Sequence, residues 1–181
     1  MRILTGIILC TCILLLTGCN TYRTVVTQTP TVPDLSQATA SRPSLQVVGQ
    51  DEAGFIPLLA KALQDTGRFA SVHTGSEPAA GQMTVRVEVE RIIDNHSGKN
   101  ALKGAVVVAT LFIAAPFVEQ HYTRTTTSTG TIGSARVTAI TVSDVRTDAI
   151  MFSNPLDKVQ AANDAENARN LAAQIVGILD K

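Results

Sequence analysis

The distribution of cysteine most constrains how this chain can fold. All three cysteines lie within its first nineteen residues, at Cys10, Cys12 and Cys19. Residues 20–181 therefore have no side chain for a disulfide bond, a thiol nucleophile or a thiolate metal site. Trp is absent as well, so the core must be built from Val, Ile, Leu and Ala.

The cysteines lie in a segment that has the parts of a secretory signal. Arg2 precedes an uncharged apolar run from Ile3 to Leu16, and small residues follow it. The run is shorter than the roughly 20 residues that a helix needs to cross a bilayer, which favours a cleaved signal over a permanent transmembrane helix. The run closes on Leu16-Thr17-Gly18-Cys19, which resembles the lipobox of bacterial lipoproteins.

The lipobox resemblance implies a modification and a location. In that family the signal is cut before the cysteine, here between Gly18 and Cys19, and the cysteine receives fatty acyl chains, palmitate among them. One chain anchors a protein only marginally, whereas two or more hold it stably at ~0.8 kcal/mol per buried CH₂. Asn20 stands where an Asp retains enteric lipoproteins at the inner membrane, so the resemblance implies the outer membrane, with the body in the periplasm.

Composition divides the chain into three parts. Residues 1–18 are the predicted signal peptide, 19–43 the acylated cysteine and a flexible tether, and 44–181 a single domain. The tether is predicted because the segment is rich in Thr, Ser and Pro and lacks apolar periodicity.

The patterns of residues 44–181 predict an α+β domain, in which an antiparallel sheet carries an early helix and a C-terminal amphipathic helix on one face. The early helix is expected over 51–66, with Asp51 as its cap and Gly67 at its end. Strands are expected at 45–48, 68–72, 84–92, 123–131 and 136–141, with a turn over 143–148 and a partner strand over 149–153. The C-terminal helix is expected from a cap at Asp157 to Leu179, with Val159, Ala162, Ala165, Ala168, Leu171, Ile175 and Ile178 on its buried face.

Gly104 to Val118 is an uncharged apolar segment that three structures could explain. As a helix it would span ~22 Å, short of a ~30 Å hydrocarbon core, although small residues at Ala105 and Ala109 favour close helix contacts. As a membrane strand it would need a closed oligomeric barrel. Burial in the core is the favoured interpretation, with membrane or subunit contact through Gly104, Ala105, Ala109, Phe112 and Pro116 as the alternative.

No grouping of residues predicts catalysis, a cofactor or a metal. His73, His96 and His121 are scattered, and no two have the i, i+4 spacing of a helical zinc pair. The charged residues of the 84–92 strand, Arg86, Glu88, Glu90 and Arg91, are assigned to its solvated face. We find no Gly-x-Ser-x-Gly nucleophile elbow and therefore predict a protein that is not an enzyme.

Charge gives no sign of a nucleic-acid partner. Fifteen basic residues face fifteen acidic ones, and removal of Arg2 with the signal leaves fourteen basic residues. A near-neutral chain without a Lys/Arg block lacks the electrostatic footprint of a nucleic-acid-binding protein.

The order of the predicted elements resembles two families of outer-membrane lipoproteins. One is the plasmid-encoded surface-exclusion and complement-resistance lipoprotein, with its early helix, strand, small-residue apolar segment and Ala-rich C-terminal helix. The other is the lipopolysaccharide-assembly lipoprotein, with its helix-sheet-helix body. These resemblances favour an envelope accessory that binds a protein partner or its own copies. A membrane-inserted homo-oligomer that uses residues 104–118 and an envelope hydrolase are the alternatives.

Overall fold

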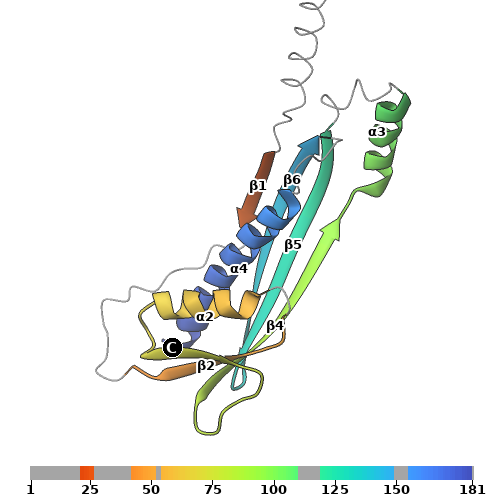
Figure 1. Cartoon of the computed structure of the whole chain (residues 1–181). Coiled ribbons are helices and arrows are strands. Elements are labelled where there is room, and N and C mark those ends of the chain that lie inside the picture. The colour runs from red at the N-terminus through yellow and green to blue at the C-terminus, as the bar shows by residue number, and fades with distance from the viewer. Residues whose placement is uncertain (1–20, 27–41, 52–53, 110–118, 149–154, 181) are drawn as a thin grey trace, which may run out of the picture.

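A single mixed sheet forms the body of the protein (Figure 1). The computed structural model describes residues 21–26, 42–51, 54–109, 119–148 and 155–180. Six strands lie in the order β1-β6-β5-β4-β2-β3, and two helices, α2 and α4, lie on one face and pack against each other. The predicted α+β class is confirmed, including the early and C-terminal helices.

The three strands at one side of the sheet are parallel. β2 (Ser44–Val48) lies between β3 (Ser71–Gly75) and β4 (Met83–Asp94) and pairs with both in parallel. The crossover from β2 to β3 is made by α2 (Phe55–Asp65), because parallel neighbours need a long connection. The sheet is therefore mostly antiparallel rather than wholly so, and β3 lies three residues later than the expected strand at 68–72.

The remaining strands form a long antiparallel meander. β5 (Glu119–Ile132) pairs with β4 and with β6 (Ala135–Asp148), and a two-residue turn with Gly133 at φ 56° joins β5 to β6. The prediction of a turn over 143–148 was wrong, because these residues continue β6 and pair with β5. The partner strand expected at 149–153 lies outside the described residues.

β1 (Thr21–Val26) corrects the expected tether. These residues pair antiparallel with β6, from Thr21 opposite Arg146 to Val26 opposite Thr141. The Thr-rich composition that predicted a tether is also compatible with a strand, since β-branched residues suit a pleated surface. The sheet therefore begins two residues after Cys19.

α4 (Pro155–Leu179) covers the sheet and closes the core. Pro155 begins the helix, where its fixed φ is tolerated, so Asp157 lies inside the helix and not at its cap. The apolar core gathers against the second half of α4 and is formed by residues of β2, α2, β4 and α4: Leu45, Val47, Phe55, Leu59, Leu63, Val85, Leu171 and Ile175. In the first half of α4, Val159 is fully buried as expected, but Ala162 is exposed and Asn163, which was not expected on the buried face, is fully buried.

α3 (Ser97–Ala109) follows β4 and projects beyond the end of the sheet (Figure 1). It includes residues 104–109 of the apolar segment, so this part is a helix and not a strand. Ala105 is exposed. Residues 110–118, with Phe112 and Pro116, lie outside the described residues.

Within the described ranges, no helix combines the length and the hydropathy that a membrane span requires.

The core predicts the effect of a truncation in α4. Leu171→Ala should lower the free energy of unfolding by about 2–5 kcal/mol, because a fully buried leucine leaves a cavity between α4 and the sheet. The matched control is Arg169→Ala in the same helix, an exposed side chain whose loss should cost at most about 0.5 kcal/mol. Urea titration followed by circular dichroism measures both. Equal effects of the two variants would contradict this packing.

Candidate functional site

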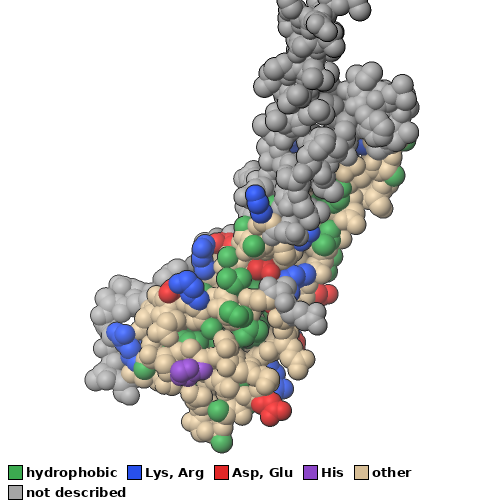
Figure 2. Space-filling model, in the orientation of Figure 1, with side chains coloured by type: hydrophobic (Ala, Val, Ile, Leu, Met, Phe, Trp, Pro, Cys, Tyr) green, Lys and Arg blue, Asp and Glu red, His purple; other side chains and the backbone are tan. Residues whose placement is uncertain are grey.

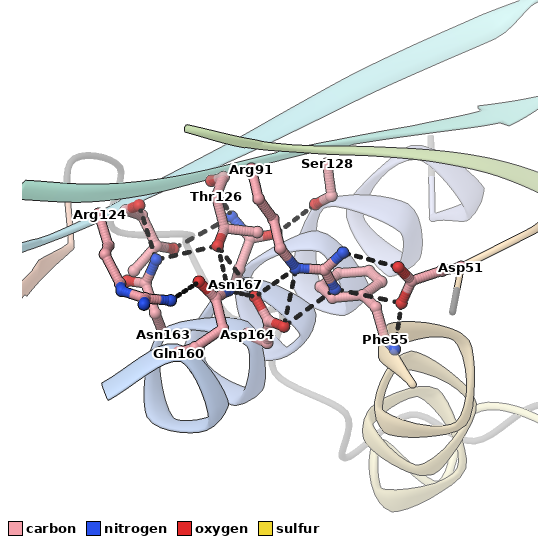
Figure 3. A network of polar contacts seen from close by, with 11 residues as sticks. Asp51, Phe55, Arg91, Arg124, Thr126, Ser128, Gln160, Asn163, Asp164 and Asn167 are labelled. Carbon is pink, nitrogen blue, oxygen red and sulfur yellow. Dashed lines mark hydrogen bonds and ion pairs between the residues drawn. The ribbon is translucent and has the colours of Figure 1, made fainter. Parts of the chain in front are cut away.

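Polar side chains fill the interface between the first half of α4 and the sheet (Figure 3). β5 and β6 direct alternate residues toward the helix, and on both strands these are hydroxyl residues that are fully buried: Thr126, Ser128, Thr141 and Ser143. Facing them on α4 are Asn163, Asp164 and Asn167, each at most 2% exposed. We call these seven residues the polar interface.

The hydrogen bonds of the polar interface connect helix to sheet directly. Asn163 Nδ2 donates to Thr126 Oγ1 at 2.9 Å, and Ser143 Oγ donates to Asn163 Oδ1 at 2.8 Å. Asn167 Nδ2 donates to the backbone carbonyl oxygen of Thr126 at 2.8 Å, and the Ser128 hydroxyl donates to Asn167 Oδ1. Buried amides thereby recover the hydrogen bonds that they lose to water.

Arg91 extends this interface to α2 through two buried carboxylates. Its Nη1 and Nη2 donate to the two oxygens of Asp51 at 2.6 and 3.1 Å, which is a bidentate pair. Its Nε and Nη2 donate to Asp164 Oδ2 at 3.0 and 2.9 Å. The side chains of Asp51 and Asp164 are 6% and 3% exposed, and that of Arg91 is 20% exposed.

Both carboxylates have further donors. The backbone N–H of Phe55, the first residue of α2, donates to Asp51 Oδ2 at 2.5 Å. The cap position itself is Gly54, so the expectation that Asp51 caps a helix beginning at 51 was wrong. Thr126 Oγ1 and Gln160 Nε2 donate to Asp164 Oδ1 at 2.9 and 2.6 Å. The oxygens of both acids thus accept hydrogen bonds from protein donors.

The electrostatics of Arg91 fit a permanent ion pair. The hydrogen bond to Asp51 is the largest cause that raises the pKa of Arg91 above its ordinary value, burial opposes it, and Asp164 raises it further. A group whose pKa is raised on folding stabilises the protein below its unfolded pKa and loses this effect only as pH rises through the folded value. Arg91 therefore stays charged throughout the neutral range and keeps its ion pairs with both carboxylates.

A second cluster joins two histidines that are distant in sequence, at the start of α3. The rings of His96 and His121 stack with centroids 4.8 Å apart, so the prediction that the histidines are scattered was wrong for this pair. His96 Nε2 lies 3.0 Å from Thr123 Oγ1, and His121 Nε2 contacts an oxygen of Asp144. Within the described ranges, no three His, Cys, Asp or Glu side chains are grouped to hold a metal ion.

Asn100 fixes α3 to the end of the sheet. Its side chain is 8% exposed, and its Nδ2 donates to the backbone carbonyl oxygens of Asn95 and His121 at 2.6 and 2.8 Å. The backbone N–H of His121 donates to Asn100 Oδ1 at 3.1 Å. One buried amide therefore joins the helix, the β4–α3 turn and β5.

The residues predicted from sequence to have a function lie partly in α3 and partly outside the described residues. Gly18 and Cys19 lie outside the described residues, as do Phe112 and Pro116. Gly104, Ala105 and Ala109 belong to α3.

Two signals in the sequence could have identified the polar interface. Val85, Val87 and Val89 alternate along β4 on the side that faces the helices, and Arg91 is the next residue of this series. Strict alternation therefore places Arg91 on the helix-facing side, and its assignment to the solvated face was wrong. In α4 the buried polar residues recur at helical spacing, as the series Asn163, Asp164, Asn167 and Asn170 shows. A search for apolar periodicity alone passes over both patterns.

On the face that Figure 2 shows, the described charged side chains outside these clusters form no patch of a single sign. On the face shown in Figure 2, basic and acidic side chains are interspersed over the body. The exposed ion pairs, such as Lys61 with Asp65, are each worth at most about 1 kcal/mol and position no functional group.

Removal of Arg91 should destabilise the protein strongly. Arg91→Ala leaves two buried carboxylates without their cation, so the free energy of unfolding should fall by about 3–5 kcal/mol. The matched control is Arg86→Ala in the same strand, whose exposed side chain should change stability by only about 0.5 kcal/mol. Chemical denaturation measures the difference, and a small effect of Arg91→Ala would show that the cluster is not structural.

Asn100→Ala should release α3 without unfolding the sheet. Loss of the buried amide costs about 1–3 kcal/mol locally, because the carbonyl of His121 loses its donor. Hydrogen exchange read by mass spectrometry should become faster in Ser97–Ala109 and stay unchanged in β2 and α2. Lys99→Ala, an exposed change in the same helix, should leave exchange unaltered; equal acceleration by both variants would contradict the anchoring role of Asn100.

No protein-family model and no curated protein matches this chain. Among solved structures, the PelC dodecamer from Paraburkholderia phytofirmans is similar over 85% of this chain and 98% of that chain, with 15% identity and a TM-score of 0.35. A point variant of the same dodecamer is similar over the same shares, with 15% identity and a TM-score of 0.34. This level of similarity assigns the chain to no family.

Proposed function

We propose that this chain is a lipid-anchored protein of the bacterial envelope that binds a protein partner or its own copies and catalyses no reaction. The observation that carries the proposal is Leu16-Thr17-Gly18-Cys19 at the end of the apolar run. Acyl chains on Cys19 would hold the protein at the outer membrane with its body in the periplasm.

The position of β1 supports cleavage before Cys19. The first strand starts at Thr21, so removal of residues 1–18 takes no residue from the described sheet. Cys19 would then be the sole cysteine of the mature chain, which agrees with a body that is held together by its core and by the polar interface.

The organisation of the polar clusters supports a role in binding rather than in catalysis. A catalytic acid or base needs a proton-transfer atom within reach of a substrate. The carboxylates of Asp51 and Asp164 are instead buried and receive donors from Arg91, Phe55 and Thr126. Their role is to join α2, β4 and α4.

Mass spectrometry of the protein purified from membranes tests the lipid anchor. The N-terminal peptide should begin at Cys19 and carry acyl chains, whereas Cys19→Ser should remain an uncut precursor without them. The matched control is Cys10→Ser, which alters a cysteine within the signal and should leave cleavage and acylation unchanged. An unmodified Cys19 in the native protein, or normal processing of Cys19→Ser, would refute the anchor.

A further inference from the structure

The strand register places Thr21, the first residue of β1, toward the end of the sheet at which α3 lies. Thr21, the first residue of β1, lies opposite Arg146 of β6, and Arg146 lies opposite His121 of β5. Two residues further along β5, Thr123 lies opposite Asp94, the last residue of β4. In Figure 1 the start of β1 and helix α3 accordingly lie toward the same end of the molecule.

The exposed large apolar side chains of the described residues gather at this end. Ile92 and Ile93 at the end of β4 are 52% and 47% exposed, and Leu102 of α3 is 70% exposed. Ile92 and Ile93 are successive residues of β4 and point to opposite faces of the sheet, so apolar side chains are exposed on both faces at this end, and α3 follows after a short turn. We call these three residues the α3-end surface. Exposed apolar groups of this kind commonly mark a contact with a membrane or a protein.

The orientation of α3 directs Leu102 outward. Asn100 is buried and bonded to the backbone of His121, so its side of the helix faces the sheet. At 3.6 residues per turn, Leu102 lies about 200° around the helix from Asn100 and therefore points away from the body. The helix contains two lysines and no acidic residue, a composition that suits the surface of a membrane.

The chain between Cys19 and β1 is too short to separate the anchor from this end. Two residues connect Cys19 to Thr21, and a fully extended chain spans at most about 7 Å over that length. If Cys19 is acylated, its chains enter the lipid and hold the first residue of β1 beside the headgroups. The end of β4 at Asp94 lies at the level of Arg23, two residues along β1 from Thr21, so it is held near the headgroups as well.

We propose that the α3-end surface rests in the headgroup region of the bilayer that holds the acyl chains of Cys19, so that the sheet stands on the membrane by this end. The inference rests on the proposed lipid anchor. The occupant is lipid because the anchor keeps this end within reach of the bilayer, which raises its effective concentration there. A weak apolar contact is sufficient under those conditions.

Fluorescent labels on the full acylated protein test this orientation. Cys19 is consumed by acylation, so Leu102→Cys introduces a single reactive thiol for an environment-sensitive dye such as NBD. The matched control is Ser134→Cys in the exposed β5–β6 turn, which lies roughly 30 Å along β5 from Thr123. Both proteins are reconstituted in phosphatidylcholine–phosphatidylglycerol vesicles with nitroxide-labelled lipids, and iodide serves as the quencher from the water phase.

The expected result is blue-shifted emission and strong quenching by nitroxide lipids at position 102, with iodide protection. The label at position 134 should show quenching by iodide and little by the lipids. If mass spectrometry shows that Cys19 is acylated and the two labels nevertheless behave equally, this inference is overturned and the lipid anchor is left intact. A label at 102 that is protected from iodide but not quenched by lipid would indicate a contact between proteins and also overturn it. A Cys19 without acyl chains would overturn both proposals.

Discussion

The ion pairs of Arg91 are the interaction on which the arrangement of the elements depends. Its guanidinium joins Asp51, 40 residues earlier in the chain, to Asp164, 73 residues later, and so ties α2, β4 and α4 at one point. Two buried acids would repel each other around a single cation, but the N–H of Phe55 and the hydroxyl of Thr126 share the remaining charge. Because a buried carboxylate is costly without such partners, only one relative placement of these three elements satisfies all of them.

The two halves of α4 contact the sheet by different physical means. In the second half Leu171 and Ile175 approach Gly130, where a Cβ atom would lie only 3.3 Å from the end of Ile175, and the contact is apolar. Apolar contacts tolerate sliding of one element over another, whereas hydrogen bonds do not. The amides of Asn163 and Asn167 in the first half therefore fix the position of α4 along β5 and β6. Stability comes mainly from the apolar half, and the unique docking position from the polar half.

The sequence predicted those elements whose exposed and buried faces differ in polarity. The alternation of Val85 and Val87 with charged residues identified β4, and Gly67 marked the end of α2. The same reasoning failed where polar residues are buried: the strand over 143–148 was taken for a turn because Ser143 and Asp144 are typical of turns. The histidine pair could not be found from spacing, since His96 and His121 meet only through the pairing of β4 with β5. In each failure, tertiary pairing decided the structure and local composition did not.

The pairing of β1 with β6 covers part of one edge of the sheet. Without β1, the 14-residue β6 would present a long row of unpaired backbone groups, which invites pairing with another chain. With it, the six residues of β1 cover Thr141–Arg146 of β6, and the opposite edge is the five-residue strand β3. Over Thr141–Arg146 the backbone groups of β6 are therefore paired within the chain. Under the proposed anchoring, the strand that covers this part of β6 is also the one attached to the lipid, so the anchor and the sheet are joined without a tether between them.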